Sequence, residues 1–193
     1  MTASAEFRLR RLLSEARRLA DSKSHDGALI LAFSLVDTLG LINAPASKVD
    51  AGSSTFCAWL DEYLLPLPGE TVTSDDLWGA RCGIVHALTQ ESRHARAGRA
   101  RLVIWRRDLT SGPRDPSWSR HLELAIQNVP SIVRYPWNAS QICVVSLEGF
   151  LDALAVGLDR FLEHLETDQV LQESMSHRLH ASLTVLTITD SYL

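Results

Sequence analysis

The 193-residue chain is poor in the residue types that mark several special classes of protein. It contains only 10 glycines and 7 prolines, too few for collagen or for a low-complexity disordered chain. Its three cysteines, Cys57, Cys82 and Cys143, are widely spaced and include no C-x-x-C pair. We therefore expect neither a disulfide framework nor a structural zinc site, and we predict a protein of the reducing cytoplasm.

Long apolar runs are also absent. The longest is the six residues from Ala28 to Phe33, whereas a transmembrane helix needs roughly 20. The Arg-rich N-terminal segment contains Glu6 and Glu15, and no apolar stretch with a cleavage site follows it. We predict that this segment is the first helix of the fold rather than a targeting sequence, and we expect no membrane partner.

Lysine is scarce, since 17 of the 19 basic residues are arginine. The net charge of −4 argues against a protein that coats DNA, but segment 93–107 is rich in arginine and has no acidic residue. Guanidinium groups bind phosphate in a planar, bidentate manner. Four candidate phosphate-binding residues are Arg93, Arg96, Arg99 and Arg101. The alternative is a solvated loop and an edge strand protected by charge.

The spacing of apolar residues predicts a mainly α-helical protein. The expected helices cover about 4–22, 24–44, 55–65, 73–88 and 147–166. Thr73 and Asp76 are typical of a capping box, Ser24 or Asp26 could cap the second helix, and Ser146 could cap the last.

Short β-strands are expected at 101–107, 141–145 and 183–189, and segment 118–127 could be a helix. The chain has no internal repeat and no long linker. We predict one domain, 1–193, formed by a helical bundle with a small β element. Its core helices would lie at about 4–90 and 147–166, and an insert at about 91–146 would carry strands.

Arg81 and His86 form the motif with the clearest chemistry. They lie in the predicted fourth helix, within Asp-Leu-Trp-Gly-Ala-Arg-Cys-Gly-Ile-Val-His from Asp76 to His86. An Arg and a His separated by four to six residues resemble the signature of the HEPN superfamily, the higher eukaryotes and prokaryotes nucleotide-binding domains. The pattern Arg-Cys-Gly-x-x-His and the helix order over roughly residues 5–90 are similar to a bacterial branch of that superfamily.

The resemblance implies a HEPN-like antiparallel helical bundle that cleaves RNA without a metal or another cofactor, as a toxin or a defence effector. It implies a homodimer with the active site in the cleft between subunits, and a nucleotidyltransferase-like antitoxin as a partner. Arg81 and His86 would then be the catalytic residues, and the arginines of segment 93–107 would bind RNA.

These two side chains suit such a reaction. Imidazole ordinarily titrates at about pH 6.5, so His86 could take the proton of a ribose 2′-hydroxyl or protonate the leaving 5′-oxygen. Arg81 could hold the phosphate as its oxygens gain negative charge. Attack by the 2′-oxygen would give 2′,3′-cyclic phosphate and 5′-hydroxyl ends, and DNA, which lacks this nucleophile, would be spared.

The spacing of the two residues has a geometric consequence. Five residues at about 100° each place Arg81 and His86 about 140° apart around an ideal helix. We therefore expect that they do not converge within one helix, and that a twofold axis brings two copies of the helix together.

Two further residues are candidate supporting groups. Cys82 stands where many members of the superfamily have Asn, Asp or His, and could be a polar thiol beside Arg81 or an inert apolar residue. Asp37, in the second predicted helix, could orient Arg81 or His86. Alternatively, Arg81 pairs structurally with Asp37, Asp75 or Asp76. The protein would then be a non-catalytic HEPN-like dimerisation module that binds RNA, a nucleotide or a partner protein.

Weaker signals come from two other groups of residues. Four aromatic residues could either stack on nucleic-acid bases or pack in the core: Trp105, Trp118, Tyr135 and Trp137. A metal-like spacing on one helix face is formed by Glu173, His177 and His180. Because no catalytic motif accompanies this spacing, we predict no metal site there.

Overall fold

The computed structural model describes residues 3–45, 47–67, 70–89, 91–106, 137, 139–173 and 178. Within these residues the protein is mainly helical and has one small parallel sheet of two strands. The elements in chain order are α1 (Ala3–Asp21), α2 (His25–Asn43), α3 (Ser53–Trp59), the π-helical turn η1 (Leu60–Leu64), α4 (Ser74–Ala87), α5 (Arg93–Arg96), β1 (Leu102–Arg106), the 3-10 turn η2 (Ala139–Gln141), β2 (Ile142–Ser146) and α7 (Leu147–Thr167).

The predicted helices and the first two predicted strands are confirmed within a few residues. The third predicted helix, 55–65, is in fact an α-helix that continues as a π-helical turn. The short helix α5 was not predicted, because four residues are too few for a periodic pattern. The predicted strand at 183–189 and the segment 118–127 lie outside the described residues.

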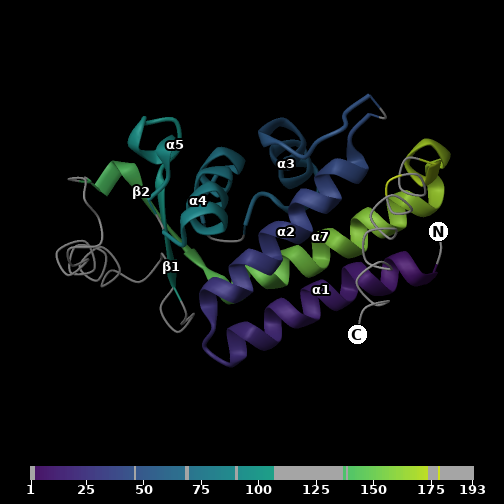
Figure 1. The fold of residues 1–193 in the computed structure, drawn as a ribbon, viewed down its shortest axis with the longest axis horizontal. Helices are drawn as coiled ribbons and strands as arrows, with labels where there is room; N and C mark the ends of the chain where they lie inside the picture. Colours follow the sequence, from purple (N-terminus) through teal and green to yellow (C-terminus); the bar gives the residue numbers. More distant parts are fainter. Residues whose placement is uncertain are drawn as a thin grey trace, which may run out of the picture.

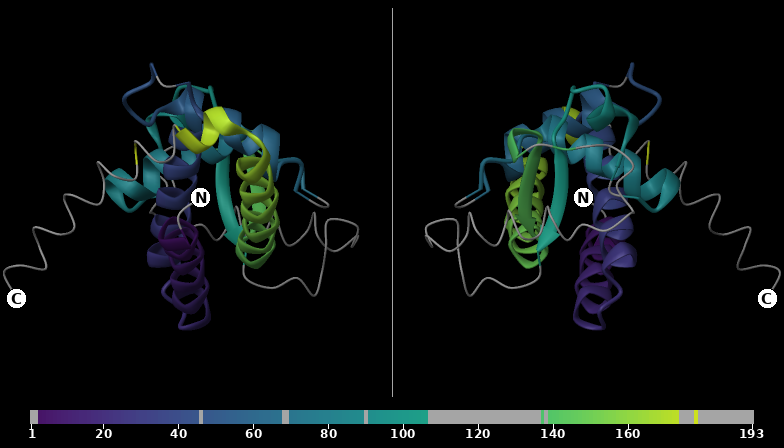
Figure 2. Two further views of the ribbon diagram at one scale, coloured as in Figure 1. Left: turned by 90° about the vertical axis from the view of Figure 1, so that its right-hand side faces the viewer. Right: turned by 90° about the vertical axis from the view of Figure 1, so that its left-hand side faces the viewer.

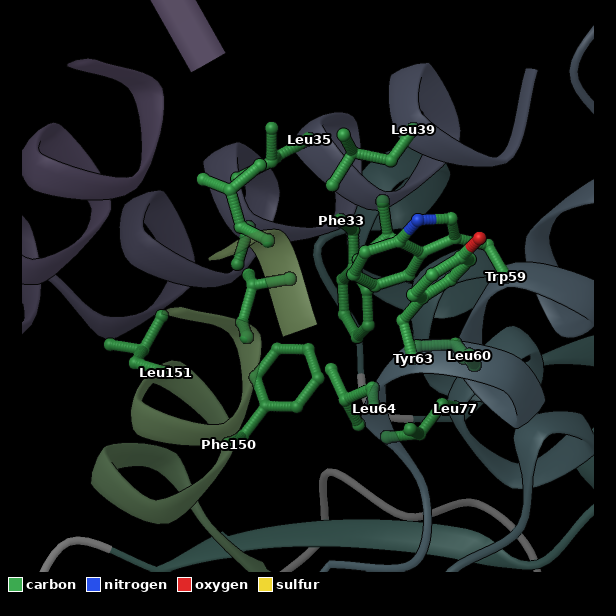
Figure 3. Close-up of a cluster of buried hydrophobic side chains, with 14 of the residues drawn as sticks. Phe33, Leu35, Leu39, Trp59, Leu60, Tyr63, Leu64, Leu77, Phe150 and Leu151 are labelled. Atoms are coloured by element: carbon green, nitrogen blue, oxygen red, sulfur yellow. The ribbon is translucent and has the colours of Figure 1, made fainter. Parts of the chain in front are cut away.

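Helix α2 is the centre of the bundle. It contacts α1, α3 and α4, and α1 also contacts α7 (Figure 1). Its buried side chains lie on most sides of the helix, as its apolar composition predicts. Phe33 of α2 packs against Phe150 of α7, with ring centroids 5.7 Å apart, and both side chains lie in the core shown in Figure 3.

By length and composition alone, α2 is apolar enough to cross a membrane, which the prediction from the six-residue apolar run did not anticipate. Half of its most apolar window is buried inside the fold. Leu35 and Leu39 are fully buried in the core (Figure 3). Burial to this extent is typical of a helix at the centre of a helical bundle.

The two short strands form a small sheet, and the second of them leads directly into α7. They pair in parallel, with Leu102 opposite Ile142 and Arg106 opposite Ser146. Ser146 ends β2 and caps α7, since its hydroxyl accepts a 2.9 Å hydrogen bond from the backbone N–H of Gly149. Strand β1 lies between the α1–α2 pair and α7 (Figure 2), and its Trp105 contacts Phe33 and Phe150. The sheet therefore extends the bundle core.

Candidate functional site

Helix α4 carries Arg81 and His86, and both of its ends are well defined. Thr73 and Asp76 form the predicted capping box: the Thr73 hydroxyl accepts from the Asp76 backbone N–H, and the Asp76 carboxylate accepts from that of Thr73. The helix ends at Leu88, which has the left-handed backbone angle φ of 48°. Leu77, Ala80 and Ile84 are buried. This anchoring fixes the helix face that carries Arg81.

Arg81 is held by Asp37 of the neighbouring helix α2. Its Nε and Nη2 atoms donate to the same oxygen, Asp37 Oδ2, at 3.0 and 2.8 Å. The two side chains are only 15% and 16% exposed. Among the three acidic partners that the sequence left open, Asp37 is thus the one that pairs with Arg81. The expected supporting role of Asp37 toward Arg81 has a direct geometric basis.

Arg81 also contacts His86 within the same chain. The distance from Arg81 Nη1 to His86 Nε2 is 2.8 Å. The expectation that these residues cannot converge within one helix was therefore wrong. That expectation considered only the directions in which the two side chains leave the helix. The long arginine side chain instead reaches around the helix to the exposed imidazole.

The contact also defines the state of the imidazole. A guanidinium group only donates hydrogen bonds, so His86 Nε2 must be the acceptor. A hydrogen bond in this arrangement therefore requires an unprotonated Nε2, with the ring proton on Nδ1. A neutral imidazole beside a fixed cation is the form that can accept a proton.

Trp78 connects Arg81 to the next element of the chain. The guanidinium carbon of Arg81 lies 5.1 Å from the centre of the Trp78 ring, a cation–π arrangement. The other neighbours of this ring are Phe56 at 5.3 Å and His94 of α5 at 6.3 Å. Trp78 lies three residues before Arg81, a helical spacing that could have identified it from the sequence. Nothing in the sequence marked His94.

Gly79 allows α5 and the turn after it to pack closely on α4. A Cβ atom at this position would lie 2.9 Å from Cβ of Ala100 and 3.4 Å from Oγ of Ser92. Since real Cβ atoms do not approach that closely, a larger residue would push the 92–100 segment away. The arginines of α5 are therefore fixed close to the helix that carries Arg81.

Cys82 is half-buried beside Arg81. Burial raises the pKa of its thiol above the usual value, and the charge and hydrogen bond of Arg81 oppose this only in part. The group is therefore a neutral thiol near pH 7 rather than a thiolate. It is a small neutral neighbour of the ion pair.

The four predicted phosphate-binding arginines fall into two groups. Arg93, Arg96 and Arg99 are exposed, and the only ion pair described for them is a 4.0 Å approach of Arg96 to Glu91. Arg101 instead donates from Nε and Nη2 to Asp76 Oδ2, at 3.0 and 2.6 Å. Its Nη2 also donates to the carbonyl of Thr71 at 2.6 Å. These bonds occupy its guanidinium, so the prediction that Arg101 binds RNA does not fit this geometry.

The predicted aromatic and metal-like groups are only partly within the described residues. Trp105 packs in the core with Phe33 and Phe150, and Trp137 is half-buried. The other predicted members lie outside the described residues: Trp118, Tyr135, His177 and His180. Within the described ranges, no group of three or more His, Cys, Asp or Glu side chains could hold a metal ion.

The site therefore brings together Asp37, Trp78, Arg81, Cys82 and His86, with the arginine-rich turn of α5 beside them. No protein-family model, curated protein sequence or solved structure matches this chain.

Proposed function

We propose that this protein is a metal-independent RNA endonuclease of the HEPN type, in which Asp37, Arg81 and His86 form the active site. The observation that carries the proposal is the 2.8 Å contact between Arg81 Nη1 and His86 Nε2, beside the Asp37 pair. A fixed cation next to a neutral, exposed imidazole is the arrangement that 2′-hydroxyl attack on a phosphodiester requires.

Arg81 can hold a phosphate without losing Asp37. A guanidinium has five N–H donors, of which two donate to Asp37, one to His86 and one to Cys82, so one remains for a ligand besides the donor that His86 would release. Asp37 fixes the plane of the group, which lowers the entropy lost when a phosphate binds. We expect the phosphate oxygens to compete with His86 for Arg81 Nη1.

The release of His86 Nε2 then starts the reaction. This nitrogen accepts the proton of the ribose 2′-hydroxyl, and the 2′-oxygen forms a bond to phosphorus as the bond from phosphorus to the 5′-oxygen breaks. Arg81 stabilises the charge that develops on the other phosphate oxygens. The 5′-oxygen takes a proton from the imidazolium or from water. The products are a 2′,3′-cyclic phosphate and a 5′-hydroxyl end.

The exposed arginines extend the proposed site. Arg93, Arg96 and Arg99 lie on α5 and the turn after it, and α5 contacts the Trp78 ring through His94. Their positive charge would attract the RNA backbone toward Arg81 in a salt-dependent manner. Arg101 is not included, because Asp76 and Thr71 occupy its donors.

The homodimer and the nucleotidyltransferase-like antitoxin are proposed on the family resemblance alone. The geometric reason for a dimer, that one helix could not bring Arg81 to His86, no longer applies, since one chain makes this contact. A toxin or defence role in the cytoplasm belongs to the same proposal.

One observation favours the alternative of a non-catalytic binding module. Asp37, Trp78 and His86 surround the guanidinium of Arg81, as they would in a structural network that joins α2 to α4. The neutral thiol of Cys82, where many family members carry a polar group, points the same way.

Cleavage of a mixed-sequence RNA in EDTA separates the two functions. We expect Arg81→Ala and His86→Ala each to lower the wild-type rate by at least about 100-fold. Arg11→Ala, which removes an exposed arginine from α1, is the matched control and should keep the wild-type rate. If the folded wild-type protein leaves RNA intact, the binding-module function replaces the nuclease.

A further inference from the structure

A cavity of about 550 Å³ lies between α7 on one side and residues 63–67 and Glu70 on the other. It shares no lining residue with the Arg81 site. One wall is formed by α7, including Gly149, Ala153 and Val156, and the other by the apolar residues that follow η1, including Leu65 and Leu67. Val156 is 59% exposed, so the cavity is open to solvent. Volumes of roughly 300–1,000 Å³ with mainly apolar walls are typical of small-molecule sites.

The polar side chains of the cavity rim already have partners. Arg160 donates to the carbonyls of Tyr63 and Glu62, and Asp152 accepts a 2.8 Å hydrogen bond from Arg17. Both side chains are also exposed, so water satisfies their remaining hydrogen-bonding capacity and a ligand gains little from them.

Glu70 is different. Its Oε1 accepts a 2.8 Å hydrogen bond from the backbone N–H of Ser146, at the start of α7. Its Oε2 is buried and has no hydrogen-bond partner among the described residues. A carboxylate offers about four acceptor positions, so most of the capacity of this group is unused. A buried acceptor without a donor is costly, and a ligand that supplies a donor removes part of that cost.

We propose that this cavity binds a small, mainly apolar molecule that carries a neutral N–H or O–H donor for the Glu70 carboxyl group. The apolar walls favour a flat or aliphatic body, and Glu70 sets the orientation. Burial raises the pKa of the Glu70 carboxyl group above its usual value, and the hydrogen bond from Ser146 and the charge of Arg106 oppose this only in part, so a neutral donor suits the site better than a cation. The assignment is independent of RNA cleavage, because binding at α7 can be measured without the nuclease reaction.

Indole and benzofuran are the probes, since they are nearly identical in size and differ in the presence of the N–H donor. Binding to the full chain is followed by two-dimensional NMR, with the amide signals of Gly149, Ala153 and Val156 as reporters. We expect indole to shift these signals and to bind about three- to tenfold more tightly than benzofuran, the advantage of one net hydrogen bond.

Two variants localise the effect. Glu70→Gln keeps an oxygen that can accept from Ser146 but replaces the other oxygen with a donor, so the preference for indole should be lost. Ala153→Leu fills the cavity from α7 and should prevent the binding of both compounds. The proposal is overturned if neither compound shifts the α7 signals of the wild-type protein, or if indole and benzofuran bind it equally. Retention of the indole preference in Glu70→Gln would also overturn it.

Discussion

The ion pair of Asp37 with Arg81 and the ion pair of Asp152 with Arg17 have similar lengths but different surroundings. Both have N–O distances of 2.8 Å, yet the Asp37 side chain is 16% exposed and the Asp152 side chain 73%. Water screens the exposed pair, whereas loss of one partner from the shielded pair leaves a poorly solvated charge.

We therefore expect Asp37→Ala to lower the free energy of unfolding by about 3 kcal/mol, because Arg81 would remain shielded and unpaired. Asp152→Ala, the matched control, should cost less than about 1 kcal/mol. Urea unfolding of both variants checks this prediction. Equal losses of unfolding free energy in the two variants would contradict this prediction, because the burial of the Asp37 side chain would then make no difference.

The residue-level chemistry was only partly predictable from the sequence. Arg81 and His86 were identified by their spacing, and Asp37 was one of three possible partners. The choice among these partners depends on how α2 packs against α4, which no local pattern contains. The contact between Arg81 and His86 depends on the reach of one flexible side chain, and helical geometry alone predicted the opposite.

The start of α4 is an element whose stability depends on pH. Burial alone would raise the pKa of Asp76, but hydrogen bonds from Arg101 and Thr73 outweigh burial and lower this pKa below the usual value. An acid with a lowered pKa stabilises the fold above its unfolded pKa of about 3.9. This contribution is lost as the pH falls through the lower pKa of the folded state.

We expect the unfolding free energy of the wild-type protein to fall steeply below about pH 4 and that of Asp76→Asn to fall less over the same range. Urea unfolding from neutral pH to about pH 3 measures both slopes. Asp75→Asn, which changes the exposed neighbour, should follow the wild-type profile. Identical slopes for wild type and Asp76→Asn would contradict the assigned role of Asp76.

The packing of α2 against α3 depends on a close approach at one glycine. A Cβ atom on Gly40 would lie 2.5 Å from the backbone carbonyl oxygen of Thr55. By contrast, the nearest atoms to a Cβ on Gly27 of the same helix belong to the side chains of Ser24 and Leu19, which can move.

We expect Gly40→Ala to destabilise the protein by about 2 kcal/mol, despite the better helix propensity of alanine, because the backbone of α3 must shift. Gly27→Ala should be neutral or stabilising. Thermal unfolding of the two variants gives the comparison, and a stable Gly40→Ala variant would contradict the described packing of α2 on α3.

At the level of elements, the caps at Thr73 and Ser146 were predictable because each depends on residues three positions apart. The bond network of Arg101 was not, since its partner Asp76 lies 25 residues earlier in the chain. Because segment 93–107 has no acidic residue, the sequence indicated that Arg101 was available to bind RNA. Its acidic partner, Asp76, is instead supplied by helix α4.

For the whole molecule, the position of both reactive groups on one helix has a consequence for any assembly. If Arg81 and His86 of the same chain act together, each subunit of a dimer carries a complete pair. A mixture of Arg81→Ala and His86→Ala proteins should then cleave RNA no faster than the sum of the two separate rates. Native mass spectrometry first establishes whether mixed dimers form. A mixture of such dimers that is faster than this sum would show that the two subunits share one site.

The central claim is that His86 takes the proton of a ribose 2′-hydroxyl while Arg81 holds the adjacent phosphate. The most direct measurement compares one RNA oligonucleotide with its 2′-O-methyl counterpart in EDTA, with the products identified by mass spectrometry. We predict that only the unmodified RNA is cleaved, and that its fragments end in 2′,3′-cyclic phosphate and 5′-hydroxyl groups. Cleavage of both oligonucleotides, or of neither by the folded wild-type protein, would contradict the account.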